Sequence, residues 1–296
     1  MSAQPPRGSI GKLVVIGVGL IGGSFSLALK KAGCVKHVVG VGRSRANLDA
    51  AVSLGVIDEA ADDASQAVKD ADFVLIATPV GQMPEVMAAI APALGEQTIV
   101  TDGGSTKQDV IAYAERFLGR HFERFVPSHP IAGTEKSGAT AAFAELYCDR
   151  NVILAPQPGT RPDAAQRVRA AWEACGARVI ELEARHHDEI FAAVSHLPHV
   201  VAFALVSMLA KRPDAGTLLG FSGGGLRDTV RIAGSSPEMW RDICMANRDA
   251  LILLLDDYVQ ELERARAAIE SGDGNALEGM FERARNARRK WLLKEG

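Results

Sequence analysis

Apolar residues in the first 180 positions form short continuous runs that alternate with patterns of helical period. Runs that are apolar throughout are typical of strands buried on both faces of a parallel sheet. The predicted strands lie at residues 12–17, 37–41, 72–77, 98–102, 124–128, 151–155 and 178–181. Helical patterns separate them, for example at 22–32, 83–94 and 162–175. This alternation of strands and helices predicts a doubly wound parallel sheet.

Strand-like runs disappear after residue 183, and long helical patterns take their place, at residues 187–211, 237–271 and 275–293. We therefore predict an α/β fold class with two domains. A doubly wound sheet occupies residues 1–183, and an all-α domain occupies residues 184–296. Because a small helical unit has little core of its own, its apolar faces favour association. We expect a homodimer formed through the helical domain.

The composition adds few constraints beyond solubility. A chain of 296 residues is long enough for two domains, and 23% charged with 47% hydrophobic residues is typical of a soluble protein. The formal net charge of −3 gives no electrostatic reason to expect a nucleic-acid or membrane partner. The four cysteines contain no Cys-x-x-Cys pair, which argues against a disulfide framework and predicts a cytoplasmic location. They are Cys34, Cys148, Cys175 and Cys244.

The apolar run from Leu13 to Leu29 resembles a signal peptide. Glycines and serines interrupt it, and Lys30-Lys31 follow it in place of a small-residue cleavage site. A buried strand that enters a glycine turn and then a helix accounts for the same residues, and we favour this interpretation.

The glycine turn has the spacing of a dinucleotide-binding fingerprint, Gly17-Val18-Gly19-Leu20-Ile21-Gly22, between a predicted strand and a predicted helix. The first glycine permits the tight turn, the second lets the backbone approach a pyrophosphate, and the third packs helix on strand. The alternative is a packing turn without a ligand. The predicted cofactor-binding residues are Gly17, Gly19, Leu20, Ile21 and Gly22, with Thr78 and Pro79 at the end of the third predicted strand.

The end of the second predicted strand bears on which dinucleotide is bound. An NAD-binding fold usually has a carboxylate there for the ribose 2′-hydroxyl. Here the residues are Gly42-Arg43-Ser44-Arg45, which offer two guanidinium groups and a hydroxyl to a 2′-phosphate. We predict NADP as cofactor, bound by Arg43, Ser44 and Arg45, with NAD as the alternative if these arginines are solvated surface charges.

His129 is the strongest candidate among seven histidines for a proton acceptor. It follows a strand-like run, on a turn, and precedes Pro130, which favours an extended backbone. Ligand sites in open parallel sheets lie beyond the carboxyl ends of the strands, which places His129 on the cofactor side. Ser105 follows another predicted strand on that side, within reach of His129 or the nicotinamide. We predict that both residues are catalytic.

A second pair of imidazoles lies in Ser195-His196-Leu197-Pro198-His199, where a continuous helix would place His196 and His199 on one face. The spacing raises the question of a metal. Neither an acid nor a cysteine lies at a matching spacing, so we predict no metal site. We expect one of the two histidines to face the substrate and the other to pack or cap.

Arg227 and Arg231 are four residues apart after three glycines, so one helix would place both on the same face. Two neighbouring guanidinium groups repel each other unless an anion lies between them, and their planar forks match a carboxylate. The alternative is a solvated surface in which Asp228 is a local partner. Trp240 follows and would form an apolar wall. The pattern indicates an oxidoreductase that acts on a small anionic substrate.

Taken together, these motifs resemble the prephenate/arogenate (cyclohexadienyl) dehydrogenases of tyrosine biosynthesis. The resemblance extends over nearly the whole chain in order. The matching segments are Gly17–Gly22, Asp102–Lys107, His129–Ser137, Ser195–His199 and Gly223–Trp240.

The resemblance implies a Rossmann domain followed by a helical dimerisation domain, and a decarboxylating oxidation with hydride transfer to NAD(P). It implies that His129 takes the proton of the ring hydroxyl and that Ser105 positions His129 and the cofactor. Arg231 would bind the ring carboxylate. Residues near the side-chain carboxylate would be His199 and Arg227, and Trp240 would line the pocket. NAD-using relatives carry an acid where Gly42 stands, so the chain resembles the NADP-using branch.

Two other function classes compete with this one. A two-domain hydroxy-acid dehydrogenase usually needs a lysine base on an interdomain helix, where this chain has His196 and His199. A nucleotide sensor without catalysis typically loses the proton acceptor or the substrate cations, and this chain has both. The choice between prephenate and arogenate stays open, and Asp188 is a candidate partner for the arogenate ammonium group.

Overall fold

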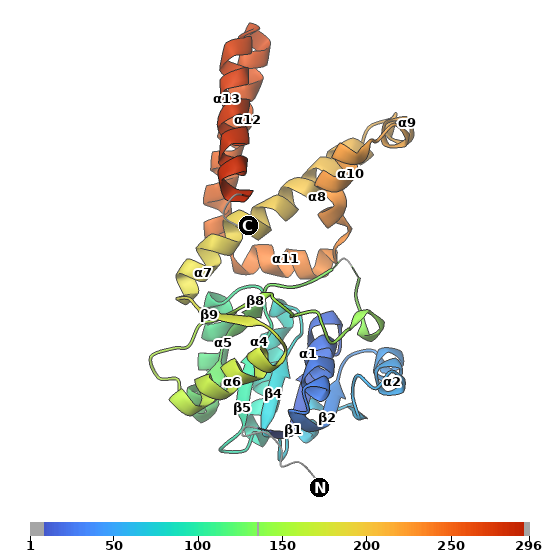
Figure 1. Ribbon diagram of the computed structural model, residues 1–296, viewed down its shortest axis with the longest axis vertical. Helices are drawn as coiled ribbons and strands as arrows, with labels where there is room; N and C mark the ends of the chain where they lie inside the picture. Colours follow the sequence, from blue (N-terminus) through green and yellow to red (C-terminus); the bar gives the residue numbers. More distant parts are fainter. Residues whose placement is uncertain (1–8, 135, 293–296) are drawn as a thin grey trace. The chain divides into compact units, whose positions relative to one another are not determined.

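The computed structural model describes residues 9–134 and 136–292. Its larger sheet has six parallel strands in the order β3-β2-β1-β4-β5-β6. Figure 1 shows the central strands β2, β1, β4 and β5 of this sheet. The strands are β1 (Ile10–Ile16), β2 (Val35–Val41), β3 (Glu59–Ala61), β4 (Phe73–Ile76), β5 (Ile99–Asp102) and β6 (Phe125–Val126). The predicted doubly wound parallel sheet is confirmed, with β3 as a short edge strand that the hydrophobic pattern did not reveal. Its winding reverses between β1 and β4, which is where such folds bind ligands.

Helices cover both faces of this sheet because successive strand residues point to opposite sides. The helices are α1 (Leu20–Lys31), α2 (Arg45–Ser53), α3 (Ala64–Ala67), α4 (Met83–Ile90), α5 (Gln108–Phe117) and α6 (Pro162–Ala174). Short 3₁₀ turns are η1 (Val80–Gln82), η2 (Ala91–Ala93), η3 (Gly119–Arg124) and η4 (Ala139–Ala141). Leu13 and Val15 of β1 pack on the side of α1, α2 and α6, whereas Val14 and Ile16 pack on the side of α3, α4 and α5.

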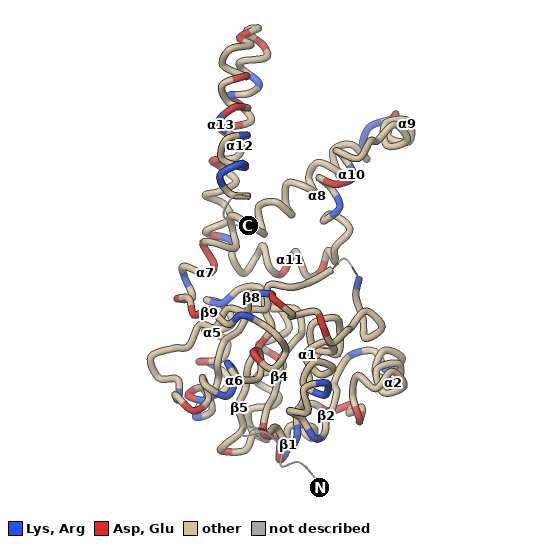
Figure 2. The backbone as a smooth tube through the Cα atoms, in the orientation of Figure 1, with Lys and Arg blue, Asp and Glu red and all other residues tan. Residues whose placement is uncertain are grey.

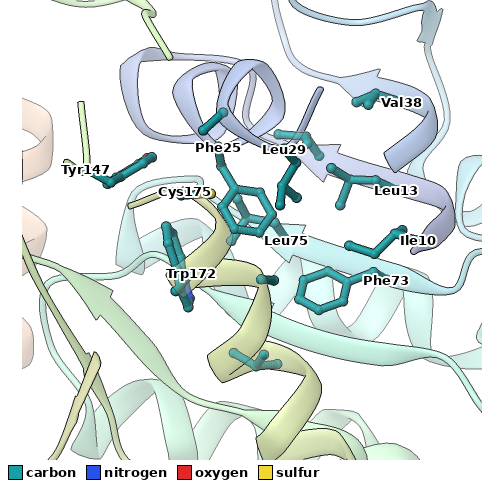
Figure 3. Packing of buried hydrophobic residues seen from close by; sticks show 14 of the residues in the cluster. Ile10, Leu13, Phe25, Leu29, Val38, Phe73, Leu75, Tyr147, Trp172 and Cys175 are labelled. Carbon is teal, nitrogen blue, oxygen red and sulfur yellow. The ribbon is translucent and has the colours of Figure 1, made fainter. Parts of the chain in front are cut away.

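The first of these clusters is rich in aromatic residues (Figure 3). Phe25 of α1 lies with its ring centroid 4.5 Å from that of Trp172 of α6, and Tyr147 lies 5.1 Å from the same indole. Full burial of such side chains contributes about 1.5–3 kcal/mol each. The run from Leu13 to Leu29 is therefore β1, the glycine turn and α1, as the favoured interpretation predicted.

A second, smaller sheet contains β7 (Ser128–Pro130), β8 (Asn151–Leu154) and β9 (Arg178–Glu181). β7 is antiparallel to β8, and β8 is parallel to β9. The strand predicted at 124–128 is thus divided between two sheets at Pro127. Proline has no N–H to donate to a ladder, so pairing with the first sheet ends there.

The rest of the described chain is helical. Its elements are α7 (Ala184–Phe191), the π turn η5 (Ala192–His196), α8 (Leu197–Ala210), α9 (Ala215–Gly220), α10 (Gly224–Val230), the 3₁₀ turn η6 (Arg231–Gly234), α11 (Pro237–Ala246), α12 (Arg248–Ser271) and α13 (Gly274–Leu292). The helix predicted at 187–211 contains a π turn because Pro198 lacks the N–H of a regular helical bond. The helix predicted at 237–271 is interrupted at Asn247, which caps α11.

The chain divides into two compact units, the first ending at Arg248 and the second beginning at Asp249. In the second unit, residues of both charge signs are interspersed along α12 and α13 (Figure 2). The domain boundary predicted near residue 183 lies just after β9, the last strand of the described chain, and it stays a prediction.

One described stretch, Ala184–Ala210, is long and apolar enough to cross a membrane by length and composition alone. Core helices of soluble proteins pass the same test, so this is weak evidence for a membrane span. Only 22% of its most apolar 18-residue segment is buried. This exposure makes it a candidate for covering by another protein surface.

Candidate active site

The glycine turn after β1 leaves an open helix terminus. A Cβ at Gly17, which has φ +102°, would lie 2.5 Å from the carbonyl oxygen of Ala77, and one at Gly22 would lie 2.3 Å from the carbonyl oxygen of Gly17. A Cβ at Gly19 would meet nothing within 4 Å. The terminus of α1 has no side-chain cap and no acid in its first turn. Its N–H groups and the open space fit a dinucleotide pyrophosphate. Leu20 and Ile21 supply the first two helical N–H groups.

Thr78 and Pro79 follow β4, the strand beside β1. The chain is held there by a hydrogen bond of 2.7 Å from the Ala77 N–H to the carbonyl oxygen of Ile16. The hydroxyl oxygen of Thr78 is buried and has no hydrogen-bond partner in the described part of the chain. Buried polar atoms normally have a partner, so an unpaired one beside the glycine turn suits a ligand contact.

The residues that follow β2 form ion pairs and hydrogen bonds with other residues of the chain. Arg45 bonds to Asp49 at 2.8 Å and to Asp62 at 3.3 Å, and these contacts raise the pKa of Arg45. Arg43 lies 3.4 Å from Glu238 of α11. The hydroxyl of Ser44 caps α2 by accepting a hydrogen bond from the Asn47 N–H at 3.3 Å. The three predicted 2′-phosphate ligands therefore lie together at the end of β2, but each has a local partner.

A buried ion pair lies under the carboxyl ends of β5 and β6. The Lys107 ammonium donates to Asp102, and it donates a second bond to the carbonyl oxygen of Ser128 at 2.7 Å. Both side chains are fully buried. Asp102 also accepts from the Ser128 N–H at 2.9 Å. These bonds fix the start of β7 and so the position of His129, the next residue.

His129 lies inside the second sheet, paired with Ile153 of β8, and not on a turn as the sequence suggested. It still lies just beyond the carboxyl end of β6, on the cofactor side. Its Nδ1 is 2.8 Å from Nε2 of His187. Burial lowers the pKa of His129 well below its usual value, and the nearby His187, Lys107 and His196 lower it further. A neutral imidazole at neutral pH is able to accept a proton.

Nδ1 of His129 is thus bonded to His187, whereas the resemblance implied that Ser105 positions His129 and the cofactor. Ser105 is half-buried in the loop after β5, and no hydrogen bond joins it to His129 among the described residues. Its contact with a cofactor stays a prediction. Sequence reasoning missed His187 because a histidine inside a helical pattern gives no signal of its own. The adjacent Asp188 was the available clue.

Asp188 is buried and saturated with protein hydrogen bonds. Its carboxylate accepts from the backbone N–H of Lys107 at 2.8 Å, from that of Gln108 at 2.9 Å, and from Nδ1 of His187 at 2.8 Å. Burial opposes ionisation, but the bonds from His187, Gln108 and Lys107 prevail and lower the pKa of Asp188. The suggestion that Asp188 binds a substrate ammonium group is therefore wrong, because its side chain joins α7 to α5.

His196 is fixed by Asn247, the residue between α11 and α12. The Asn247 amide nitrogen donates to the carbonyl oxygen of Asp188 at 2.7 Å and lies 3.1 Å from Nδ1 of His196. Since an amide NH₂ only donates, Nδ1 accepts and Nε2 carries the proton. Nε2 is buried without a partner in the described residues. Burial lowers the pKa of His196 to about 4.

His199 and Trp240 form an apolar wall. Their rings stack with centroids 3.5 Å apart and an interplanar angle of 18°. Nδ1 of His199 donates to the carbonyl oxygen of Ser195 in the π turn at 2.8 Å. Burial lowers the pKa of His199, its bond to Ser195 opposes this, and Arg231 lowers it further. Because Nδ1 is used, Nε2 is the atom of neutral His199 that can accept from a ligand.

The two candidate arginines lie on different elements. Arg227 belongs to α10, which ends at Val230, whereas Arg231 begins η6. The expectation of one continuous helix is therefore wrong, since the backbone tightens to 3₁₀ turns at Arg231. Both side chains are exposed, and Nε of Arg227 is 3.4 Å from the Ser222 hydroxyl. Arg231 is close enough to His199 to influence its pKa.

Within the described residues, no group of three or more His, Cys, Asp or Glu side chains is arranged to hold a metal ion. The residues brought together are instead a glycine turn, a buried unpaired hydroxyl, neutral imidazoles and two exposed cations. Such a site can bind a dinucleotide and move a proton beside it. An anionic substrate could be held at its exposed end.

Comparisons with known proteins agree with this geometry. The family model of the prephenate dehydrogenase nucleotide-binding domain matches residues 25–181, and that of the prephenate dehydrogenase dimerization domain matches residues 183–283. A cyclohexadienyl dehydrogenase of Zymomonas mobilis is 40% identical over 279 residues, which cover 93% of this chain and 94% of that protein. A prephenate dehydrogenase of Bacillus subtilis is 37% identical, with 93% and 75% covered.

Solved structures show the same likeness. Prephenate dehydrogenase from Aquifex aeolicus, in complex with hydroxyphenyl propionate and NAD+, has a TM-score of 0.87 at 34% identity, with 95% of this chain and 98% of that chain covered. Arogenate dehydrogenase of Synechocystis has a TM-score of 0.76 at 28% identity, with 95% and 99% covered. The family models together span most of the sequence, so this chain belongs to the prephenate dehydrogenase family.

Proposed function

We propose that this protein catalyses the oxidative decarboxylation of a cyclohexadienyl substrate in tyrosine biosynthesis, with NADP as the preferred hydride acceptor. The substrate is arogenate, prephenate or both. The observation that carries the proposal is His129, a neutral imidazole held at the same sheet edge as the glycine turn. The family membership supplies the reaction class.

In this reaction His129 takes the proton of the ring hydroxyl. The O–H electron pair becomes the C=O bond as hydride leaves the same carbon. The ring carboxylate then departs as CO₂, its bonding electrons complete the aromatic ring, and the C=O electron pair returns to the oxygen, which takes back a proton from the protonated His129. A bound nicotinamide would supply the hydride acceptor. General base catalysis of this kind contributes about 10²–10⁴-fold to the rate.

The exposed end of the site is the proposed anion subsite. We assign the ring carboxylate to Arg231 and the side-chain carboxylate to His199 and Arg227. The stacked pair of His199 and Trp240 would contact the ring face. A guanidinium fork suits a planar carboxylate, and its bonds to charged oxygens are worth about 1.5–3 kcal/mol.

The preference for NADP rests on the end of β2. Gly42 stands where an acid would bind a ribose 2′-hydroxyl, and Arg43 lies next to it with an exposed side chain. The local ion pairs of Arg43 and Arg45 must loosen for either to bind a 2′-phosphate. Both are exposed pairs, which solvent screens, so loosening them costs little.

We also propose a homodimer formed through residues 184–296, the helical part beyond the predicted domain boundary. The matching family model is that of a dimerization domain. Large apolar side chains are exposed along this part of the chain, at Val194, Met208, Leu219, Phe221, Leu253 and Ile269. A partner copy would cover such a surface. The four cysteines are free thiols, which suits the reducing cytoplasm.

The test is a set of initial rates with prephenate and with arogenate, each with NAD and with NADP. The expected result is turnover, fastest with NADP. Turnover mainly with NAD would overturn the assignment of Arg43 and Arg45 but keep the reaction. Failure in all four combinations would overturn the proposed function.

A further inference from the structure

The imidazole of His129 is the end of a buried chain of hydrogen bonds that begins at Asp188. Asp188 lies 2.8 Å from Nδ1 of His187, and Nε2 of His187 lies 2.8 Å from Nδ1 of His129. The side chains of His187 and Asp188 are 0% and 2% exposed. Neither residue reaches the reacting atoms, so both act on the substrate only through His129.

The acceptor at one end determines the direction of every bond in this chain. Oδ2 of Asp188 accepts from the backbone N–H and the side-chain amide of Gln108, at 2.9 and 3.2 Å, while Oδ1 accepts from the Lys107 N–H at 2.8 Å. A carboxylate held by three donors remains ionised and can only accept. Nδ1 of His187 must therefore carry a proton and donate it to Asp188.

The rest of the chain follows from the chemistry of imidazole. A neutral ring has one donor and one acceptor nitrogen, so Nε2 of His187 accepts. Its donor is Nδ1 of His129, which must then carry the proton. We propose that Asp188 and His187 are positioning residues that fix the proton of His129 on Nδ1 and leave Nε2 bare, ready to accept the hydroxyl proton of the substrate.

The packing around the two rings supports this role. Phe191, one turn after His187 on α7, contacts both: its ring centroid is 4.8 Å from that of His129 and 4.5 Å from that of His187. The phenyl ring holds the imidazoles in orientation and excludes water that would offer other partners. The charged groups that influence the pair are Lys107, Asp102 and Asp188, with the neighbouring imidazole of His196.

The chain also has a role after proton transfer. When Nε2 of His129 gains the proton, the resulting cation still donates from Nδ1 to His187, and His187 still donates to Asp188. The charge is thus stabilised by a carboxylate through one intervening ring, in the manner of Ser–His–Asp triads. In such triads, changing the carboxylate to an amide reverses the tautomer and lowers kcat by about 10⁴-fold.

This inference rests on the proposed function for its kinetic readout, so its first test is independent of turnover. Nitrogen NMR of the ¹⁵N-histidine-labelled full chain reports which ring nitrogen is protonated, and the spectrum of His129→Asn identifies the signals of His129. We expect a protonated Nδ1 and a bare Nε2 at pH 7.5. A proton on Nε2 of His129 would overturn the proposal even if the enzyme turns over prephenate or arogenate as proposed.

The second test compares variants of the neighbouring His186 and His187, with prephenate and arogenate as substrates. We expect His187→Leu to lower kcat by about 10²-fold or more with little change in the Kd for NADP. His187→Gln should recover much of this loss, because its amide oxygen can accept from His129 and its NH₂ can donate to Asp188. His186→Gln, a change at an exposed ring on the same helix, is the matched control and should retain full activity.

Asp188→Asn should lower kcat at least as much and move the His129 proton to Nε2. Asp188 also accepts from the backbone N–H groups of Lys107 and Gln108 at the start of α5. If the loss of these bonds prevents the variant from folding, the comparison of His187→Leu with His187→Gln decides alone. Equal kcat in those two variants would contradict the directed chain of bonds, since a residue that only packs gains nothing from a glutamine amide.

Discussion

The buried and exposed ends of the candidate site differ in how completely the residues of one chain enclose and hydrogen-bond their side chains. At the buried end, Lys107, His187 and Asp188 are almost fully buried, and each is held by several hydrogen bonds. At the other end, Arg227 and Arg231 are exposed, and nearby Phe221 is 87% exposed. The difference teaches that the proposed proton-accepting end is organised before substrate arrives, whereas the proposed anion subsite depends on what covers the arginines. Preorganisation of reacting groups is what lowers barriers.

The largest expected effect comes from breaking the buried end at its reacting ring. His129→Asn removes the proposed proton acceptor, and we expect kcat to fall by about 10²–10⁴-fold. The Kd for NADP, measured by titration of protein fluorescence, should change by less than about twofold because the glycine turn is untouched. A variant that keeps wild-type kcat would show that another group accepts the proton.

The next largest effect is on the stability of the fold, and it comes from the buried His196. Burial lowers the pKa of His196 to about 4, so the folded state binds fewer protons than the unfolded state between about pH 6.5 and 4. The stabilisation that comes from neutral, buried His196 is complete above about pH 6.5 and is lost as pH falls toward about 4. His196 alone should contribute a loss on the order of 3 kcal/mol.

Urea unfolding of wild type and His196→Gln at a series of pH values measures this contribution. Glutamine can still meet the Asn247 amide through its oxygen, and it does not titrate. The free energy of unfolding of the variant should therefore depend less on pH across the window. Parallel curves for the two proteins would contradict the assignment.

The sequence predicted the parts of this site that depend on local pattern. The glycine turn and the strands that are apolar on both faces are each recognised from residues only a few positions apart, and the structure contains them. The second sheet, with His129 in its first strand, depends on the pairing of residues 128–130 with residues far along the chain. No local pattern encodes that pairing, so a turn was predicted.

The same limit explains the missed bond partners. Asp188 meets Lys107 from 81 positions away, and Asn247 meets His196 from 51 positions away. A sequence shows that these side chains are polar but not which groups face them. The sequence suggests Asp188 as a substrate contact because it lies near His196 in the chain, but its burial depends on the backbone N–H groups of Lys107 and Gln108, which only the fold brings near.

A smaller effect is expected from breaking the exposed end. Arg231→Ala should raise the KM for prephenate or arogenate by about 10- to 100-fold, the value of one or two bonds to a charged oxygen. Arg227→Ala should raise it less, because we assign the side-chain carboxylate to Arg227 and His199 together. Initial rates over a range of substrate concentrations give both values. An unchanged KM in Arg231→Ala would place the ring carboxylate elsewhere.

The smallest effect is expected at the end of β2, where we propose that one exposed charge decides between two cofactors. Arg43→Ala should lower the ratio of kcat/KM with NADP to that with NAD by about tenfold, which corresponds to about 1.4 kcal/mol. The rate with NAD itself should change little, because no 2′-phosphate is present to lose a partner.

Arg185→Ala is the matched control, since Arg185 is an equally exposed arginine whose ion pair is with Glu189 of its own helix. It should leave the cofactor ratio unchanged. Glu238→Gln acts in the opposite direction: by releasing Arg43 from its partner at 3.4 Å, it should raise the ratio slightly. If Arg43→Ala and Arg185→Ala give the same ratio, Arg43 is a surface charge, and the missing acid at Gly42 has another explanation.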